Sequence, residues 1–157
     1  IDALHAALIS HSGDALVVPA LNRDGDCLSD MVLQLFGSIA GAESQLLAFD
    51  DDFRASAVMA EAPHGTAPTL QGKNVANPLA MILAGASVLP YMGDERATRV
   101  SRAIYEGALE AVAEDVRTAD LGGHCGTDEF TDEVIKRVRT KLDVWEALGD
   151  SAVHYTG

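Results

Sequence analysis

The sequence predicts an α/β fold, in which short strands are flanked by helices. Two short apolar runs, residues 15–19 and 57–60, are typical of buried strands. Elsewhere, apolar residues recur at steps of three and four, which is the pattern of amphipathic helices that face a core. With 157 residues, of which 48% are hydrophobic, the chain is long enough to bury one core, so we expect a single domain over 1–157.

The first part of the chain is expected to run from helix to strand to turn to helix. Helical spacing at residues 4–9 precedes the strand at 15–19, and the sequence Asn-Arg-Asp-Gly at 22–25 is expected to form a turn. A helix should then extend from residue 26 to about 39. Its N-terminus would lie at the carboxyl end of the strand, where α/β sheets bind ligands.

The rest of the chain is expected to be mostly helical. A polar and acidic segment at 41–55, in which residues 50–52 are expected to form a solvated loop, precedes the strand expected at 57–60. Three helices should follow, over residues 78–89, over residues 95–114 and from Thr127 onward, with Thr127 as the cap of the last. Residues 143–157 lack a clear periodicity and are expected to be a tail of unknown role.

Charge and composition narrow the choice of partners. The formal net charge of −13 opposes nonspecific binding to nucleic acid or to an anionic membrane. The longest apolar run, 78–92, is shorter than the roughly 20 residues that cross a bilayer, so we expect no membrane partner. Two cysteines, Cys27 and Cys125, are too few for a disulfide framework, and the start of the chain lacks the features of a signal peptide. We therefore expect a reduced, cytoplasmic setting.

Two aspartates at the start of the helix at 26–39 are candidate metal ligands. Asp26 and Asp30 are four residues apart, so their side chains share one helical face with Cβ atoms roughly 6 Å apart. Mg²⁺ or Mn²⁺ is typically held by one or two carboxylates, with substrate and water in the remaining positions. The alternative is that Asp26 caps the helix and Asp30 is simply solvated.

The loop at residues 61–77 is a candidate nucleotide site. His64 offers a flat surface for stacking, and Gly65 lets the backbone approach a ligand closely. Thr66 adds a hydroxyl group, and Asn77 offers both a donor and an acceptor. For His64, the alternative is a loop histidine that is bonded to nearby backbone.

The loop and the aspartate pair together resemble the isocitrate and isopropylmalate dehydrogenases, a family of metal-dependent β-decarboxylating dehydrogenases. The resemblance covers about residues 1–140 and implies a partial isopropylmalate-dehydrogenase-like fold, corresponding to the C-terminal part of a full member. It implies a cofactor site made of Glu61, His64, Gly65, Thr66, Ala67, Thr69, Asn77 and Asp120. For the metal it implies Asp26 and Asp30, and Asp2, 24 residues before Asp26, as a ligand contributed by the neighbouring subunit of a dimer.

The activity implied by the resemblance is the oxidative decarboxylation of a small 2-hydroxy acid. The cofactors would be NAD or NADP, together with Mg²⁺ or Mn²⁺ as a Lewis acid. Isocitrate ranks first as substrate and 3-isopropylmalate second. Thr69 departs from the family, in which an aspartate at this position accompanies NAD and a lysine accompanies NADP, and the resemblance favours NAD here.

The family's catalytic residues belong to the part of a full member that precedes this chain. We therefore expect the chain alone to be inactive and to work as a homodimer or with a complementing chain. A noncatalytic nucleotide-binding or regulatory subunit that needs a complete partner is the alternative. A third possibility is a dimerisation module that uses the helix at 78–89, but such a module has no use for the motif residues.

Overall fold

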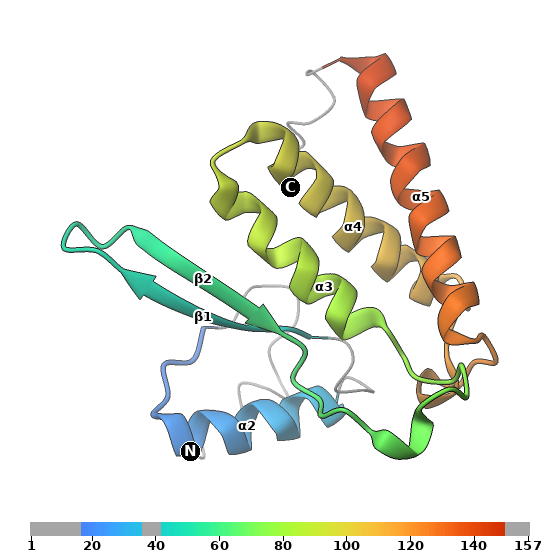
Figure 1. Ribbon diagram of the computed structural model, residues 1–157, viewed down its shortest axis with the longest axis horizontal. Coiled ribbons are helices and arrows are strands. Elements are labelled where there is room, and N and C mark those ends of the chain that lie inside the picture. Colours follow the sequence, from blue (N-terminus) through green and yellow to red (C-terminus); the bar gives the residue numbers. More distant parts are fainter. Residues whose placement is uncertain (1–16, 36–41, 150–157) are drawn as a thin grey trace. The chain divides into compact units, whose positions relative to one another are not determined.

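The computed structural model describes residues 17–35 and 42–149 (Figure 1). Its contacts divide the chain into two units, Ile1–Met31 and Val32–Gly157, and each is described by itself. Helices and a two-stranded sheet make up the described part, so the chain has the predicted α/β fold. The helix expected at 4–9 and the end of the tail, 150–157, lie outside the described residues.

Helix α2 (Asn22–Leu35) starts earlier than the sequence suggested. The expected turn at 22–25 is its first turn, because the amide of Gly25 donates to the carbonyl of Leu21 at 2.7 Å. A glycine inside a helix costs only about 1 kcal/mol, and Asp24 in the first turn compensates by interacting favourably with the helix dipole. Asp26 and Asp30 therefore lie beyond the first turn, and the alternative that Asp26 caps the helix is wrong.

The prediction of a strand at 15–19 is wrong for residues 17–19, the part that the structure describes. Residues 17–20 have no helix or strand, and Val17 is 86% exposed. A buried strand needs neighbouring strands that complete its backbone hydrogen bonds. Among the described residues, only β1 and β2 form strands, and they pair with each other.

Strands β1 (Ser44–Phe49) and β2 (Ala55–Glu61) form an antiparallel hairpin. The polar segment 41–55 thus contains a strand that the sequence analysis did not predict. The acidic run does form the turn, because Oδ1 of Asp50 accepts from the amides of Asp52 and Arg54 at 3.0 and 2.8 Å. Tyr105 donates a hydrogen bond to the Glu43 carboxylate and so ties the base of the hairpin to α4. Burial and this carboxylate raise the pKa of Tyr105.

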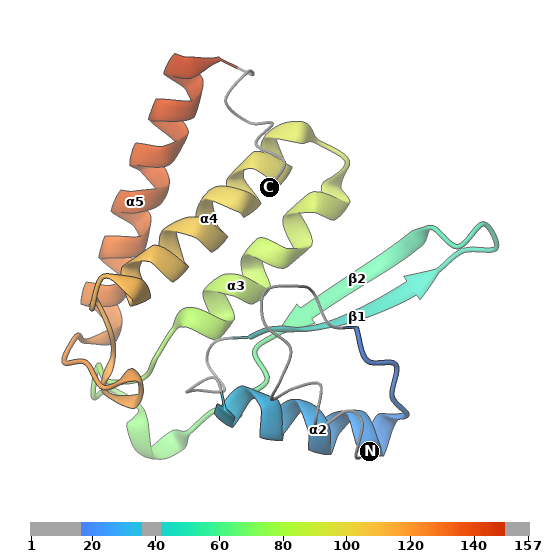
Figure 2. The same ribbon diagram turned by 180° about the vertical axis from the view of Figure 1, so that it is seen from behind.

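Three helices form the rest of the second unit: α3 (Leu79–Val88), α4 (Glu95–Ala113) and α5 (Thr127–Leu148). Helix α4 packs against α3 on one side and α5 on the other, and α3 also packs on β2 (Figures 1 and 2). Their shared core is made of Leu79, Leu83, Ala108, Ala111, Phe130 and Val134. The expected helices at 78–89 and 95–114 are confirmed, and α5 continues to Leu148, into the segment expected to be a tail.

The cap of α5 differs from the prediction. Gly126 is the N-cap residue, and its amide donates to Oε2 of Glu129 at 2.8 Å. Thr127 is instead the first residue of the helix. A Cβ atom at position 126 would lie 2.6 Å from Nδ2 of Asn74, so any other residue there would displace the Asn74 side chain.

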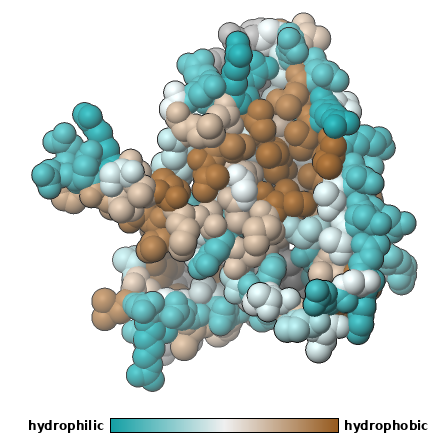
Figure 3. All heavy atoms as spheres, viewed as in Figure 1, coloured by the Kyte–Doolittle hydropathy of each residue, from teal (hydrophilic) through white to brown (hydrophobic). Residues whose placement is uncertain are grey.

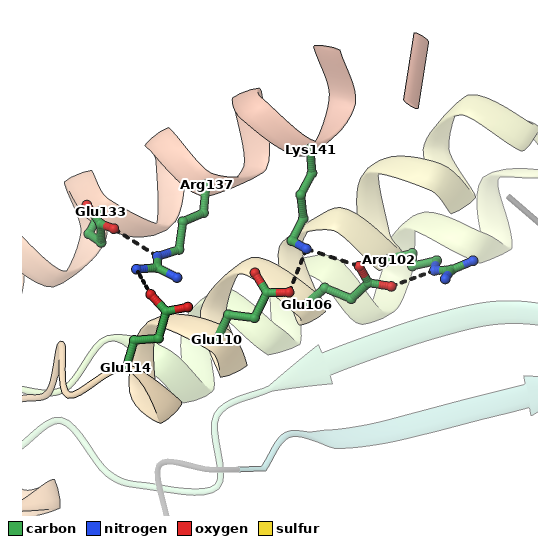
Figure 4. Close-up of polar contacts among 7 residues, drawn as sticks. All are labelled: Arg102, Glu106, Glu110, Glu114, Glu133, Arg137 and Lys141. Carbon is green, nitrogen blue, oxygen red and sulfur yellow. Dashed lines mark hydrogen bonds and ion pairs between the residues drawn. The ribbon is translucent and has the colours of Figure 1, made fainter. Parts of the chain in front are cut away.

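Helices α4 and α5 approach closely and are linked by charged side chains (Figure 4). A Cβ atom at Gly107 would lie 3.3 Å from the Cβ of Arg137. Beside this contact, Arg137 pairs with Glu114 at 2.9 Å, and Lys141 pairs with Glu110 at 2.6 Å. The missing side chain at position 107 therefore permits the helix spacing at which these ion pairs form.

One face of the second unit is apolar (Figure 3). Apolar residues gather around α3, where Met81 is 58% exposed, and Met92 in the following 3₁₀ turn (Leu89–Met92) is 69% exposed. The helix at 78–89 is apolar nearly all round, but only one of its faces is buried in the second unit. Within the described residues, no helix is both long and apolar enough to span a membrane.

Candidate functional site

The loop that follows β2 lines an open pocket of about 1190 Å³. The lining comes from residues 64–68, 70–72 and 74–77, together with Asp120 and Thr127. Binding pockets for small molecules typically measure roughly 300–1,000 Å³, so this pocket has room for a nucleotide. All of its lining residues belong to the second unit.

Left-handed backbone conformations give the loop its shape. Ala62, directly after β2, is buried beside Ala80 of α3, which fixes the start of the loop. Ala67 then has a φ of 39° and leads into a 3₁₀ turn (Pro68–Leu70), and Gly72 and Asn74 have φ values of 74° and 56°. Glycine and asparagine tolerate this region of φ better than other residues. These conformations and the 3₁₀ turn bend the chain around the pocket that it lines.

His64 lies at the entry of the loop with its side chain exposed. Its Nδ1 is 3.0 Å from the carbonyl oxygen of Gly65, so Nδ1 donates. This is the backbone contact that the alternative for His64 described. A bond at the ring edge leaves the ring faces able to stack on a base.

Asn77 and Asp120 meet in the lining of the pocket, although they are 43 residues apart in sequence. Nδ2 of Asn77 donates to Oδ2 of Asp120 at 2.9 Å, and Oδ1 of Asn77 accepts from the amide of Leu79 at 2.9 Å. The hydroxyl of the buried Thr118 donates to Oδ1 of Asp120 at 2.5 Å. The amide and the carboxylate are thus held in fixed orientations beside the loop.

The structure brings together most of the predicted cofactor residues. His64, Gly65, Thr66, Ala67, Asn77 and Asp120 all line the pocket. Glu61, at the end of β2, and Thr69, in the 3₁₀ turn, are exposed and are not part of the lining.

The sequence analysis missed the other lining residues, which are Pro68, Leu70, Gln71, Gly72, Asn74, Val75, Ala76 and Thr127. Among them, Asn74 and Thr127 contact each other, because the amide of Thr127 donates to the carbonyl of Asn74 at 3.1 Å. The one signal in the sequence was Gly72-Lys73-Asn74, which is typical of a turn with left-handed residues. Nothing in the sequence indicated that this turn would contact the start of α5.

The structure describes two of the three predicted metal ligands. Asp26 and Asp30 are both exposed on α2, and Asp2 lies outside the described residues. Across residues 17–35 and 42–149, no three or more His, Cys, Asp or Glu side chains cluster as metal ligands would. Two carboxylates one helical turn apart still fit Mg²⁺ or Mn²⁺, which accepts ligands from water and substrate.

The sequence matches a known protein family over most of its length. A family model described as isocitrate/isopropylmalate dehydrogenase matches residues 1–134. The chain therefore belongs to the isocitrate/isopropylmalate dehydrogenase family, which confirms the predicted resemblance.

Individual relatives agree with this assignment. The chain is 35% identical over 131 residues to a regulatory subunit of the mitochondrial NAD isocitrate dehydrogenase from Dictyostelium discoideum, covering 83% of this chain and 34% of the relative. It is 36% identical over 138 residues to a decarboxylating D-malate dehydrogenase from Escherichia coli, covering 87% and 37%. The apo structure of a β-decarboxylating dehydrogenase from Thermococcus kodakarensis matches with a TM-score of 0.71 and 28% identity, over 92% of this chain and 41% of that one.

The chain thus spans about a third of the length of these two curated relatives. The fold described above is correspondingly a part of the fold seen in the solved structure.

Proposed function

We propose that this chain is the cofactor-binding part of an NAD(P)-dependent dehydrogenase that oxidises and decarboxylates a 2-hydroxy acid. The observation that carries the proposal is the pocket itself, in which the loop motif meets Asp120 across 43 residues of sequence. Isocitrate is the substrate we favour, followed by 3-isopropylmalate. A cytoplasmic location and a homodimer or a complementing chain complete the proposal.

The pocket residues would receive the adenosine half of the dinucleotide. The ring of His64 would stack on adenine, and the Asn77 amide, already oriented by Asp120 and by the Leu79 amide, would bond the adenine edge. An amide has two N–H donors, of which Asp120 takes one, so an acceptor on the base can take the other. Thr69 adds no charge near the pocket, so we propose that NAD is preferred to NADP only modestly.

The metal would be held by Asp26 and Asp30, with Asp2 of a neighbouring protomer as a further ligand. The bound Mg²⁺ or Mn²⁺ would polarise the substrate's 2-hydroxyl and the carbonyl that replaces it. The two aspartates would supply oxygen ligands and negative charge to the ion.

A second candidate is a noncatalytic nucleotide-binding or regulatory subunit. The specific support is the relative from Dictyostelium discoideum, which is named a regulatory subunit and is 35% identical. Such a subunit would bind nucleotide through the same pocket and act on a complete partner chain. Adenine nucleotide binding is therefore common to both proposals, whereas turnover with a 2-hydroxy acid belongs to the first alone.

Titration of the ¹⁵N-labelled chain with AMP tests the pocket. Shifts should concentrate in residues 64–77, and nicotinamide mononucleotide, which lacks adenine, should cause smaller ones. His64→Ala should weaken AMP binding at least fivefold, since stacking of a base on an aromatic ring is worth about 1–3 kcal/mol.

His124→Ala is the matched control, because His124 is also exposed in the second unit but does not line the pocket. Equal AMP affinity in the His64 and His124 variants, or shifts that spread evenly over the chain, would contradict the assignment.

A further inference from the structure

The wall of the pocket is fastened to the start of α5 by a set of hydrogen bonds around Asn74. Nδ2 of Asn74 donates to Oδ1 of Asp128 at 2.5 Å, and Oδ1 of Asn74 accepts from the Asp128 amide at 3.1 Å. The Asn74 carbonyl accepts from the Thr127 amide, and the Thr127 hydroxyl donates to the Ala76 carbonyl at 2.6 Å. We call these four bonds the Asn74 latch.

The loop has little else to hold it in place. Every residue from 64 to 76 is exposed, so burial of apolar surface contributes little there. Within the loop, three turn bonds join Leu70 to Ala67, Gln71 to Pro68 and Lys73 to Leu70. A segment with an exposed backbone and few packed side chains opens at low free-energy cost unless polar contacts restrain it.

The details of the latch fit a holding role. Asn74 has a φ of 56°, a conformation in which asparagine is tolerated and its side chain reaches α5. The Asn74 amide and the Glu129 amide both donate to Asp128, and these bonds lower its pKa below the usual value, so its carboxylate stays charged at neutral pH. The absence of a side chain at Gly126 leaves the space that the Asn74 amide occupies.

We propose that Asn74 is a positioning residue, which holds the pocket wall 70–77 against α5 in the shape that accepts an adenine nucleotide. The inference rests on the proposed function for its ligand. Asn74 would act on the nucleotide indirectly, by holding the loop that binds it. A purely structural role is the competing explanation, since Asn74 also satisfies two amides in the first turn of α5.

Hydrogen exchange and AMP titration of the 157-residue chain separate the two explanations. Asn74→Gly keeps the left-handed backbone and removes both side-chain bonds. Amide exchange should then rise about five- to tenfold in residues 70–77 and remain unchanged in α3, and AMP should bind about fivefold more weakly. Asp132→Ala, which removes a carboxylate from the exposed side of α5, should change neither quantity.

A double-mutant cycle with Asp128→Ala adds a second readout. If both residues act through the latch, the double variant should bind AMP no more weakly than the more affected single variant. Additive losses, unchanged exchange in 70–77, or a rise in exchange that is equal across α3, α4 and α5 would overturn the inference. Failure of the wild-type chain to bind AMP would contradict the nucleotide function, while the exchange data alone would still decide whether Asn74 holds the loop.

Discussion

Replacing Lys141 by methionine should loosen the packing of α5 on α4 without creating a cavity. The Lys141 side chain is 19% exposed and its ammonium group contacts Glu110 at 2.6 Å and Glu106 at 3.3 Å (Figure 4). Methionine keeps most of the apolar stem and removes the charge. Exposed ion pairs contribute about 0.2–1 kcal/mol each, and Glu110 is half exposed. We therefore expect a loss of about 1 kcal/mol in the free energy of unfolding, or roughly 2–4 °C in Tm.

The loss should depend on pH in a defined direction. Burial alone would lower the pKa of Lys141, but its bonds to Glu110 and Glu106 outweigh burial and raise it. Burial likewise opposes the bonds from Arg102 and Lys141 to Glu106, and the net effect lowers the pKa of Glu106. Stability from the lysine is lost as pH rises through its raised pKa, and stability from Glu106 is lost as pH falls through its lowered pKa. The difference between wild type and variant should therefore be largest between about pH 5 and 10.

Thermal unfolding at several pH values measures this effect, and Lys136→Met provides the control. Lys136 lies on the same helix and pairs with Glu133 at 3.1 Å, but it is 75% exposed, so its replacement should change Tm little. In 1 M NaCl, the Lys141 effect should shrink, since the screening length falls to about 3 Å. A Tm loss equal for the two lysine variants, or one that persists unchanged at pH 3, would refute the reasoning.

Three further predictions address the core and the two ligand sites. Phe130→Ala should cost about 3–5 kcal/mol in urea unfolding, because Phe130 is fully buried; a loss under about 1.5 kcal/mol would show that the core closes around the gap. Asp26→Asn should weaken Mn²⁺ binding about tenfold in water-proton relaxation, and unchanged binding would remove Asp26 from the metal site. Thr69→Asp should raise the ratio of NAD to NADP affinity roughly 2- to 13-fold in competition titrations, whereas an unchanged ratio would place residue 69 away from the ribose.

The helices of the second unit could be predicted because their signals are local. Pro78 marks the start of α3, and the Asp94 side chain accepts from the Arg96 amide at the start of α4. Local signals did not predict the end of α5, because Trp145 lies in a segment without a clear apolar period. Helix α5 nevertheless includes Trp145. The Arg102 guanidinium of α4 lies 5.5 Å from the centre of the Trp145 ring. Contacts with a neighbouring helix thus extend α5 beyond its own apolar pattern.

The strand predicted at 57–60 is confirmed, since it lies within β2, but β1 was missed, because pairing is decided between segments. Residues 15–19 are apolar enough for a buried strand, yet the described part of the segment pairs with no other strand. Strand β1 is mostly exposed and has no clear alternation, but its register with β2 sets Leu47 opposite Val58. Strand propensity describes how well a residue fits an existing sheet, so apolar content alone could not choose between these segments.

The candidate site shows the same division between local and long-range information. The motif identified the loop but did not indicate that Asn77 also has a structural role. Its side-chain oxygen Oδ1 accepts a hydrogen bond from the amide of Leu79, the first residue of α3. Loss of Asn77 would weaken both the helix start and the grip on Asp120, so a fall in nucleotide affinity would have two causes. His64 makes its one described hydrogen bond to the adjacent Gly65, and its ring supports no other element. A change in nucleotide affinity at His64 therefore reports on the pocket, and a change at Asn77 reports on the fold as well.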